Sequence, residues 1–294
     1  MKELVATLLV AAFTISVSSI SGHRTVELFG YPALALAALL AFGLQWLAFV
    51  PAAASRSERS YDLVGGLSFL AVLCLGLLAA ERHGLLDARR GLLATLIMIW
   101  ATRLSVFLFA RVRRSGGDGR FDAIKVDPGR FLLAWTLQGA WVMLSALPAL
   151  IQITATAPSR GFGLSEASGL ALWLVGFALE VTADRQKSAF NQRPENVGRF
   201  IERGLWSRCQ HPNYLGEILL WSGVFVYGAA EYEGLEWLAL LSPLFVYGLL
   251  TRVSGIPLLD ARAARRWGAD PDYQRYRRRT PLLWPRLRPQ RPSR

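Results

Sequence analysis

The sequence predicts an all-α integral membrane protein, a bundle of seven to eight transmembrane helices with cytoplasmic loops and a cytoplasmic tail. Of its 294 residues, 53% are hydrophobic and only 18% are charged, whereas an average soluble domain carries about 25% charged residues. The charges are clustered between long apolar runs instead of being spread along the chain. Ten tryptophans fit the same class, because tryptophan favours the interface between bilayer and water.

Eight apolar runs are long enough to cross a bilayer, which takes about 20 mostly apolar residues. They are 4–20, 31–50, 62–80, 91–110, 131–151, 167–183, 214–230 and 235–251. The first run is similar to a signal peptide, but its basic region is Lys2 alone and no clear cleavage site follows, so we expect it to remain as a helix. Without that helix the count is seven. We predict a single membrane domain over 1–294, with N-terminal helices in 1–60 and a basic flexible tail in 286–294.

Lysine and arginine in the loops predict the orientation in the membrane. The gaps 111–130 and 184–213 hold six basic residues each, and twelve more follow from Arg252 onward. With eight spans these three regions lie on one side, so we expect both termini to be cytoplasmic. The net charge of +12 does not indicate nucleic-acid binding, because the basic residues punctuate apolar runs. Anionic headgroups and phosphate-bearing cofactors account for them better.

Charged residues inside or beside the apolar runs are candidates for function, because a charge at membrane depth is costly unless it meets a partner or a polar cavity. Asp62 opens the third run next to Tyr61, Arg103 lies inside the fourth, and Arg111 follows two helical turns later. Each also has a purely structural interpretation. Asp62 is suited to a helix N-cap, Arg111 to anchoring at the interface, and Arg103 to an ion pair between helices.

A second group of candidates lies in the Arg-rich stretch 184–217. Asn213 and Glu217 are four residues apart, so they share a helix face, as do Glu180 and Asp184. Arginine binds phosphate with two parallel hydrogen bonds, while Asn and Glu can hold an amide or a ribose hydroxyl. These side chains suit a phosphorylated nucleotide, although no Rossmann glycine fingerprint is present. His211, followed by proline, is more typical of a turn or a cofactor contact than of a lone general base.

Metal and disulfide chemistry are not indicated. The three histidines are few and scattered, so no metal site is predicted, and two cysteines do not make a disulfide framework.

The strings GLWSRCQHPNYLGEILLW, SGIPLLDAR, DYQRYRRRTPLLWP, WATRLSVFLFARVRR and GGDGRF resemble the bacterial branch of the steroid 5-alpha-reductase family, a branch of uncharacterised membrane proteins. The resemblance covers 61–285. It implies an NADPH-dependent oxidoreductase acting on CH–CH groups, which reduces the C=C bond of a lipophilic enone, steroid-like or isoprenoid-like. The implied partners are that substrate, arriving from the bilayer, and membrane lipids, but no nucleic acid. The bacterial branch also implies residence in a bacterial inner membrane. The oligomeric state stays open.

The resemblance also implies roles for individual residues. The cofactor-binding positions are Arg103, Arg111, Asp184, Asn196, Arg199, His211, Asn213, Tyr214 and Glu217. Asp62 takes the place of the catalytic acid that meets the substrate carbonyl, and Tyr61 or Trp100 takes the place of the family's catalytic tyrosine. Two positions depart from the family, since Gln210 stands where an arginine is usual and nothing in 252–260 matches a C-terminal histidine.

Two alternatives belong to other classes. A shorter form of the motif, His-Pro-x-Tyr, also occurs in S-adenosylmethionine-dependent membrane methyltransferases of the isoprenylcysteine carboxyl methyltransferase type. Those enzymes have an adjacent acidic pair in the final helix, where this chain has Asp260 followed by Ala261. A non-catalytic scaffold or transporter predicts polar residues in most helices and an internal repeat, and the sequence shows neither. The reductase is therefore the prediction, and the methyltransferase is the alternative.

Overall fold

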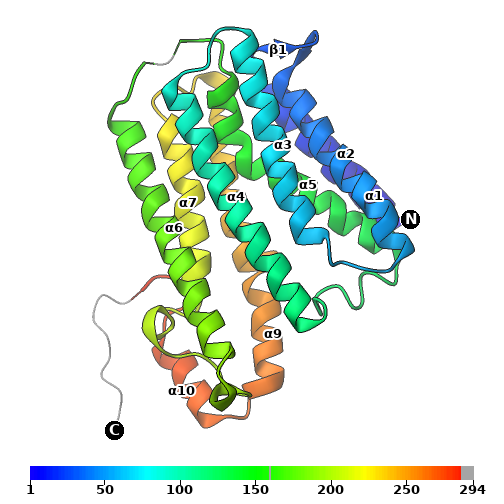
Figure 1. Cartoon of the computed structure of the whole chain (residues 1–294), viewed down its shortest axis with the longest axis vertical. Helices are drawn as coiled ribbons and strands as arrows, with labels where there is room; N and C mark the ends of the chain where they lie inside the picture. The colour runs from blue at the N-terminus through cyan, green and yellow to red at the C-terminus, as the bar shows by residue number, and fades with distance from the viewer. Residues whose placement is uncertain (159, 286–294) are drawn as a thin grey trace. The chain divides into compact units, whose positions relative to one another are not determined.

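The computed structural model describes residues 1–158 and 160–285 and is nearly all helical (Figure 1). This confirms the predicted fold class, while the predicted tail 286–294 lies outside the described residues. Seven helical stretches of this part are long and apolar enough to cross a membrane: Lys2–Ser21, Ala33–Ala54, Tyr61–Arg82, Ala88–Ser115, Pro128–Thr154, Leu164–Asn191 and Gly234–Trp267. The predicted run 214–230 is also helical, but its helix has 17 residues, the lower end of the useful range. A count of eight spans therefore stays a prediction.

The chain divides into two compact units, each described here by itself. The first comprises Met1–Glu166 and Gly228–Ser242. Its elements are α1 (Lys2–Ser21), β1 (Glu27–Leu28), β2 (Tyr31–Pro32), α2 (Ala33–Ala54), α3 (Tyr61–Arg82), α4 (Ala88–Ser115), α5 (Pro128–Thr154) and the 3-10 helix η3 (Gly234–Leu240). Helix α5 packs against the other four helices, and every residue in 142–154 is buried. A helix that is buried all round belongs to a core, so α5 is the centre of this unit.

Local sequence signals begin and end these helices. Asp87 and Asp127 are the N-caps of α4 and α5, and their carboxylates accept hydrogen bonds from backbone N–H groups of the first turn. Helix α4 ends at Gly116, whose φ of 80° is the left-handed conformation that favours glycine. Helix α4 therefore runs beyond the predicted apolar run, and Arg111 lies on its last turns instead of in a loop. The short β1–β2 hairpin was not predicted.

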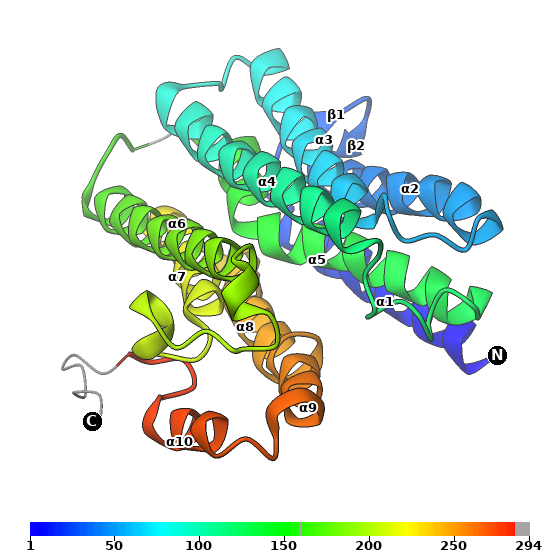
Figure 2. The same ribbon diagram turned by 60° about the horizontal axis from the view of Figure 1, so that its bottom comes forward.

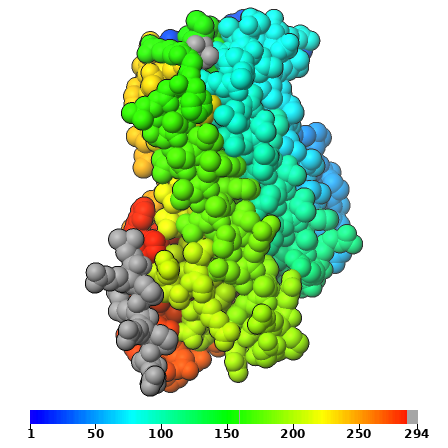
Figure 3. All heavy atoms as spheres, turned by 60° about the vertical axis from the view of Figure 1, so that its left-hand side comes forward, coloured from blue at the N-terminus to red at the C-terminus, as the bar shows by residue number. Residues whose placement is uncertain are grey.

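The second unit comprises Ala167–Tyr227 and the chain from Pro243 onward. Its elements are α6 (Leu164–Asn191), η1 (Pro194–Asn196), η2 (Gly204–Ser207), α7 (Pro212–Gly228), α8 (Leu241–Gly248), the π-turn η4 (Leu249–Val253), α9 (Ile256–Trp267) and α10 (Pro271–Arg279). Helices α6 and α7 run side by side (Figures 1 and 2). In the space-filling view, the segment after α6 and the C-terminal helices meet at the surface (Figure 3).

Glycines set the close approach of α6 and α7. A Cβ atom added to Gly176 would lie 2.5 Å from the backbone oxygen of Gly216, and one added to Gly216 would lie 2.9 Å from the Cβ of Glu180. Gly169 and Gly223 meet in the same way near the other end of the pair. Residue numbers rise on one helix as they fall on the other, so the helices are antiparallel, and the segment around Asp184 lies level with the start of α7.

Candidate functional site

The predicted site residues fall into both units. The first unit holds Tyr61, Asp62, Trp100, Arg103 and Arg111. The second holds Asp184, Asn196, Arg199, His211, Asn213, Tyr214 and Glu217.

Asp62 is the second residue of α3 and sits beside a buried charge cluster. The N-cap of α3 is Ser60, so the interpretation of Asp62 as the cap was wrong. The Asp62 side chain is 12% exposed, and its Oδ1 lies 3.9 Å from Nη2 of Arg120. Arg120 is held much closer to Asp118, at 2.5 Å. Arg120 therefore gives its ion pair to Asp118 and only a long contact to Asp62.

The same cluster joins the two polar loops of the first unit. Burial alone would raise the pKa of Asp118, but its hydrogen bonds to Arg120, with the charges of Arg120 and Arg111, hold that pKa below its usual range. The carboxylate of Glu58, which is 4% exposed, accepts the Asp118 backbone N–H at 2.8 Å and the Lys125 ammonium at 2.9 Å. Sequence reasoning missed these partners, although GGDGRF was noticed as a string.

Tyr61 and Trp100 both pack against aromatic side chains within the first unit. The Tyr61 hydroxyl donates to the Ala134 carbonyl on α5 at 2.9 Å, and its ring packs against Phe121 and Trp135. Using Tyr61 as a proton donor to a substrate would require that hydrogen bond to break. Trp100 is fully buried and packs edge-on against Phe69. Its indole is not an acid.

The two predicted arginines lie on α4. Arg103 is half-buried with its guanidinium 5.5 Å from the Phe107 ring centroid, and Arg111 is exposed.

In the second unit, His211 is the most unusual of the predicted residues. It immediately precedes α7, is 7% exposed and stacks on the Tyr214 ring. Neither ring nitrogen has a hydrogen-bond partner among the residues that the structure describes, and Nε2 lies 3.9 Å from Oδ1 of Asp260. Burial lowers the pKa of His211 to about 4, outweighing the opposite effect of the Asp260 charge, and the positive charges of Lys187 and Arg277 add to the lowering. The ring is therefore neutral at pH 7.

The C-terminal segment holds the His211 loop in place. The backbone N–H groups of Gln210 and His211 donate to the carbonyls of Pro281 and Leu282, at 2.9 Å and 3.2 Å. The Gln210 side chain donates to the carbonyls of Arg277, at 3.2 Å, and Thr280. Its carboxamide therefore has a structural role at the position where the resemblance leads us to expect arginine.

Asp260 links α9 to α10. Its two carboxylate oxygens accept from both terminal nitrogens of Arg277, at 2.5 Å and 3.0 Å, the bidentate geometry that gives strong pairs. Beside this pair is a shallow pocket of about 270 Å³. It is lined by Asp260, Ala264, Gly268, Tyr273, Gln274, Arg277 and Arg278.

The remaining predicted residues of the second unit are partly brought together. Asn213, Tyr214 and Glu217 are half-buried on the first turns of α7. Asp184 is buried on α6 at the level where α7 begins. Asn196 has a structural task, since its side-chain Nδ2 donates to the Phe190 carbonyl at 2.9 Å.

Arg199 is exposed like other arginines of its loop. In the described part of the chain, no ion pair is found for Arg199, Arg203 or Arg208.

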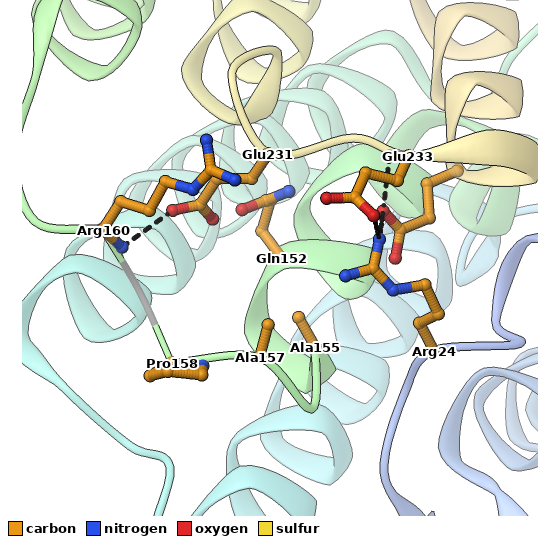
Figure 4. Close-up of a pocket in the computed structure, with 9 residues that line it drawn as sticks. Arg24, Gln152, Ala155, Ala157, Pro158, Arg160, Glu231 and Glu233 are labelled. Atoms are coloured by element: carbon orange, nitrogen blue, oxygen red, sulfur yellow. Dashed lines mark hydrogen bonds and ion pairs between the residues drawn. The ribbon is translucent and has the colours of Figure 1, made fainter.

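A second, smaller cavity lies in the first unit, and charged groups that line it already interact with one another (Figure 4). Its volume is about 40 Å³, roughly enough for one water molecule. Arg24 pairs with Glu233 at 2.7 Å, and the Arg160 backbone N–H donates to Glu231 at 3.0 Å. We do not assign a ligand to it.

Comparisons with known proteins support the family but not the reaction. The family model described as "Protein of unknown function (DUF1295)" matches residues 48–280. A curated protein, "Probable O-methyltransferase ustE" of Ustilaginoidea virens, is 26% identical over 147 residues, which are 45% of this chain and 50% of that protein. The chain thus spans about half the length of this relative. No solved structure matches.

Proposed function

The chain belongs to the DUF1295 family, which is similar to the steroid 5-alpha-reductases, and from this membership we propose that it is an NADPH-dependent membrane reductase. Its substrate is a lipophilic enone, steroid-like or isoprenoid-like, whose C=C bond is reduced.

Besides the family membership, the surroundings of His211 support the proposal. A buried imidazole with two unpaired nitrogens is an unusual group, because buried polar atoms normally have partners. His211 immediately precedes α7, whose first two turns carry the half-buried Asn213 and Glu217. The same unit holds exposed arginines, among them Arg199, for which the described residues provide no ion pair. A phosphorylated nucleotide supplies the complementary groups, namely anionic phosphates, hydroxyls and an amide.

Five of the predicted residues are our candidates for holding that cofactor. Arg199 neutralises phosphate, with Arg103 and Arg111 as further candidates, and Asn213 and Glu217 hold the nicotinamide amide or its ribose. Bound NADPH would supply a hydride.

Asp62 is our candidate for the acid. When the β-carbon of an enone receives hydride, negative charge develops on the carbonyl oxygen, and a positioned hydrogen-bond donor stabilises it. Only a protonated carboxyl can donate. Arg120 lies 2.5 Å from Asp118 but 3.9 Å from Asp62, so its charge favours ionisation of Asp118 more than that of Asp62, which supports this role.

The first experiment measures ligand-induced thermal stabilisation of the full-length protein in detergent. We expect NADPH to raise the melting temperature, NADH to raise it less, and S-adenosylmethionine to leave it unchanged. Asn213→Ala and Glu217→Ala should lose the NADPH effect, whereas the control Glu195→Ala, on the exposed η1 turn, should keep it. Equal stabilisation of all variants would refute the residue assignment, and no NADPH effect on the unmodified protein would refute the function.

The second experiment tests Asp62 by following NADPH oxidation with a panel of lipophilic enones. Asp62→Asn should lower turnover yet retain NADPH stabilisation, because an amide is a weaker donor than a protonated carboxyl and the position is not a cofactor contact. Asp122→Asn, at an exposed carboxylate, is the matched control. Unchanged turnover of Asp62→Asn would show that Asp62 is not the acid.

A membrane O-methyltransferase is the second candidate. The relative named as a probable O-methyltransferase favours it, and so does the shared His-Pro-x-Tyr turn. Against it, Asp260 is bound by Arg277 and is followed by Ala261 instead of a second acid. Stabilisation by S-adenosylmethionine without stabilisation by NADPH would select this reading.

A further inference from the structure

We propose that Asp260 is a positioning residue, which holds His211 as the tautomer with hydrogen on Nε2 and so presents Nδ1 as a hydrogen-bond acceptor to a bound nucleotide. The contact between Nδ1 and a nucleotide rests on the proposed function, whereas the effect of Asp260 on the His211 tautomer concerns this chain alone.

The first step is the geometry around the ring. Nε2 is 3.9 Å from the Asp260 carboxylate, so an approach of about 1 Å produces an ordinary N–H···O hydrogen bond. A carboxylate only accepts hydrogen bonds. An acceptor facing Nε2 therefore favours the tautomer that carries its hydrogen there.

The second step is the rigidity of the carboxylate. Asp260 comes from α9 and is fixed by the two hydrogen bonds of Arg277 on α10. The His211 backbone is itself held by the segment after α10. The same tail thus fixes both the imidazole and its partner, as outer residues commonly do for metal-binding histidines.

The third step is the remaining charges. Besides Asp260 on α9, the groups that act on the ring are Lys187 on α6 and Arg277 on α10, and Tyr214 of α7 covers one face. Two of these are positive, so protonation of the ring is disfavoured and it stays neutral. A neutral ring with hydrogen on Nε2 has a lone pair on Nδ1, which matches a ribose hydroxyl or a carboxamide N–H.

The alternative is that Asp260 has a purely structural role and only connects α9 to α10 through its ion pair with Arg277. A tautomer measurement distinguishes the two ideas, because a helix-to-helix tie has no effect on which ring nitrogen carries hydrogen. The chain has three histidines, His23, His83 and His211, so nitrogen NMR of histidine-labelled protein in detergent is practical. His211→Asn identifies the His211 signals by their loss.

We expect His211 to be neutral at pH 7 with hydrogen on Nε2. In Asp260→Ala the preference should be lost and the ring should become harder to protonate, because an attractive negative charge is removed. Asp260→Glu should restore the preference. The control is Asp272→Ala, which breaks an exposed aspartate–arginine pair within α10, with Arg275, and should change nothing at His211. An unchanged tautomer in folded Asp260→Ala, or hydrogen on Nδ1 in the unmodified protein, would overturn the proposal.

Adding NADPH tests the proposed contact between Nδ1 of His211 and the nucleotide. We expect the Nδ1 signal of the unmodified protein to shift, and Asp260→Ala to bind NADPH about three- to tenfold more weakly, the usual value of one hydrogen bond. If NADPH neither shifts the signal nor stabilises the protein, the proposed function fails while the effect of Asp260 on the tautomer still stands. If NADPH binds without moving the signal, only the proposed contact between Nδ1 and the nucleotide is wrong.

Discussion

The closest helix contact in the second unit gives the sharpest stability prediction, which is that Gly176→Ala destabilises the protein. The added methyl group would lie 2.5 Å from the Gly216 oxygen and 2.5 Å from the Leu220 nitrogen. Both atoms are backbone, so no side chain can rotate away. Restoring ordinary contact requires the two helices to separate by roughly 1 Å. Overpacking of this kind lowers the free energy of unfolding by about 1–3 kcal/mol.

Helix propensity acts in the opposite direction. Alanine is favoured over glycine in a helix interior by about 0.8–1 kcal/mol, so the net loss expected for Gly176→Ala is up to about 2 kcal/mol. Gly91→Ala on α4 is the matched control, because nothing lies within 4 Å of the added Cβ. It retains the propensity gain without the clash and should be neutral or slightly stabilising.

The assay compares melting temperatures in one detergent at one heating rate, since unfolding of such proteins is commonly irreversible and depends on that rate. For a protein of this size a loss of 1 kcal/mol lowers the midpoint by about 2–4 °C. We expect Gly176→Ala to melt clearly below the unmodified protein and Gly91→Ala at or above it. Equal midpoints for both variants would refute the packing argument.

Three further predictions concern buried or capping groups. Arg89 pairs with Glu166 at 2.8 Å and with Glu231 at 2.5 Å. Arg89→Met leaves both carboxylates without this counter-ion and should lower the free energy of unfolding by about 3–5 kcal/mol in a denaturation assay. The unfolded chain protonates His211 below about pH 6.5, but the folded chain does so only near pH 4. Stability should therefore fall as pH is lowered through that window, and His211→Asn should remove up to ~3 kcal/mol of the fall. Asp127→Ala removes the N-cap of α5 and should lower the free energy of unfolding by about 1 kcal/mol, measured by thermal melting. An unchanged melting temperature would show that the cap does not stabilise the protein.

Reactivity of Cys209 offers a separate check on the buried loop before α7. Burial raises the pKa of this thiol to about 11, and only the thiolate reacts readily. In a Cys74→Ala background, maleimide should label Cys209 only slowly until the protein unfolds, as followed by mass spectrometry. Fast labelling of the folded protein would contradict the burial.

The helices were predictable because the bilayer requires long apolar stretches, and those stretches are visible in the sequence. Their ends were harder to predict, since polar residues do not stop a helix that continues into water. Arg111 and Asp184 were placed at or beyond the ends of apolar runs, yet both lie on helices that continue to Ser115 and Asn191. Hydropathy finds the membrane-spanning part of a helix and not its full length.

The buried charge cluster beside Asp62 was beyond sequence reasoning because its partners are far apart in the chain. Glu58 bonds to Asp118 and Lys125, which lie 60 and 67 residues away. Each residue looks like an ordinary loop charge when the loop is considered alone. Only the fold shows that Asp118 takes the arginine that would otherwise pair with Asp62.

The arginines of the second unit show what structure adds to a correct count of charges. The sequence predicts a basic surface but cannot say which side chains are free to bind phosphate. Arg277 is held by Asp260 and Arg279 by Glu202, and a guanidinium committed to a carboxylate must lose that pair before it neutralises a phosphate. Arg199 and Arg203 carry no such pair in the described chain, so no ion pair would have to break for either of them to neutralise a phosphate. Their substitution should weaken NADPH binding without disturbing the C-terminal segment that holds His211.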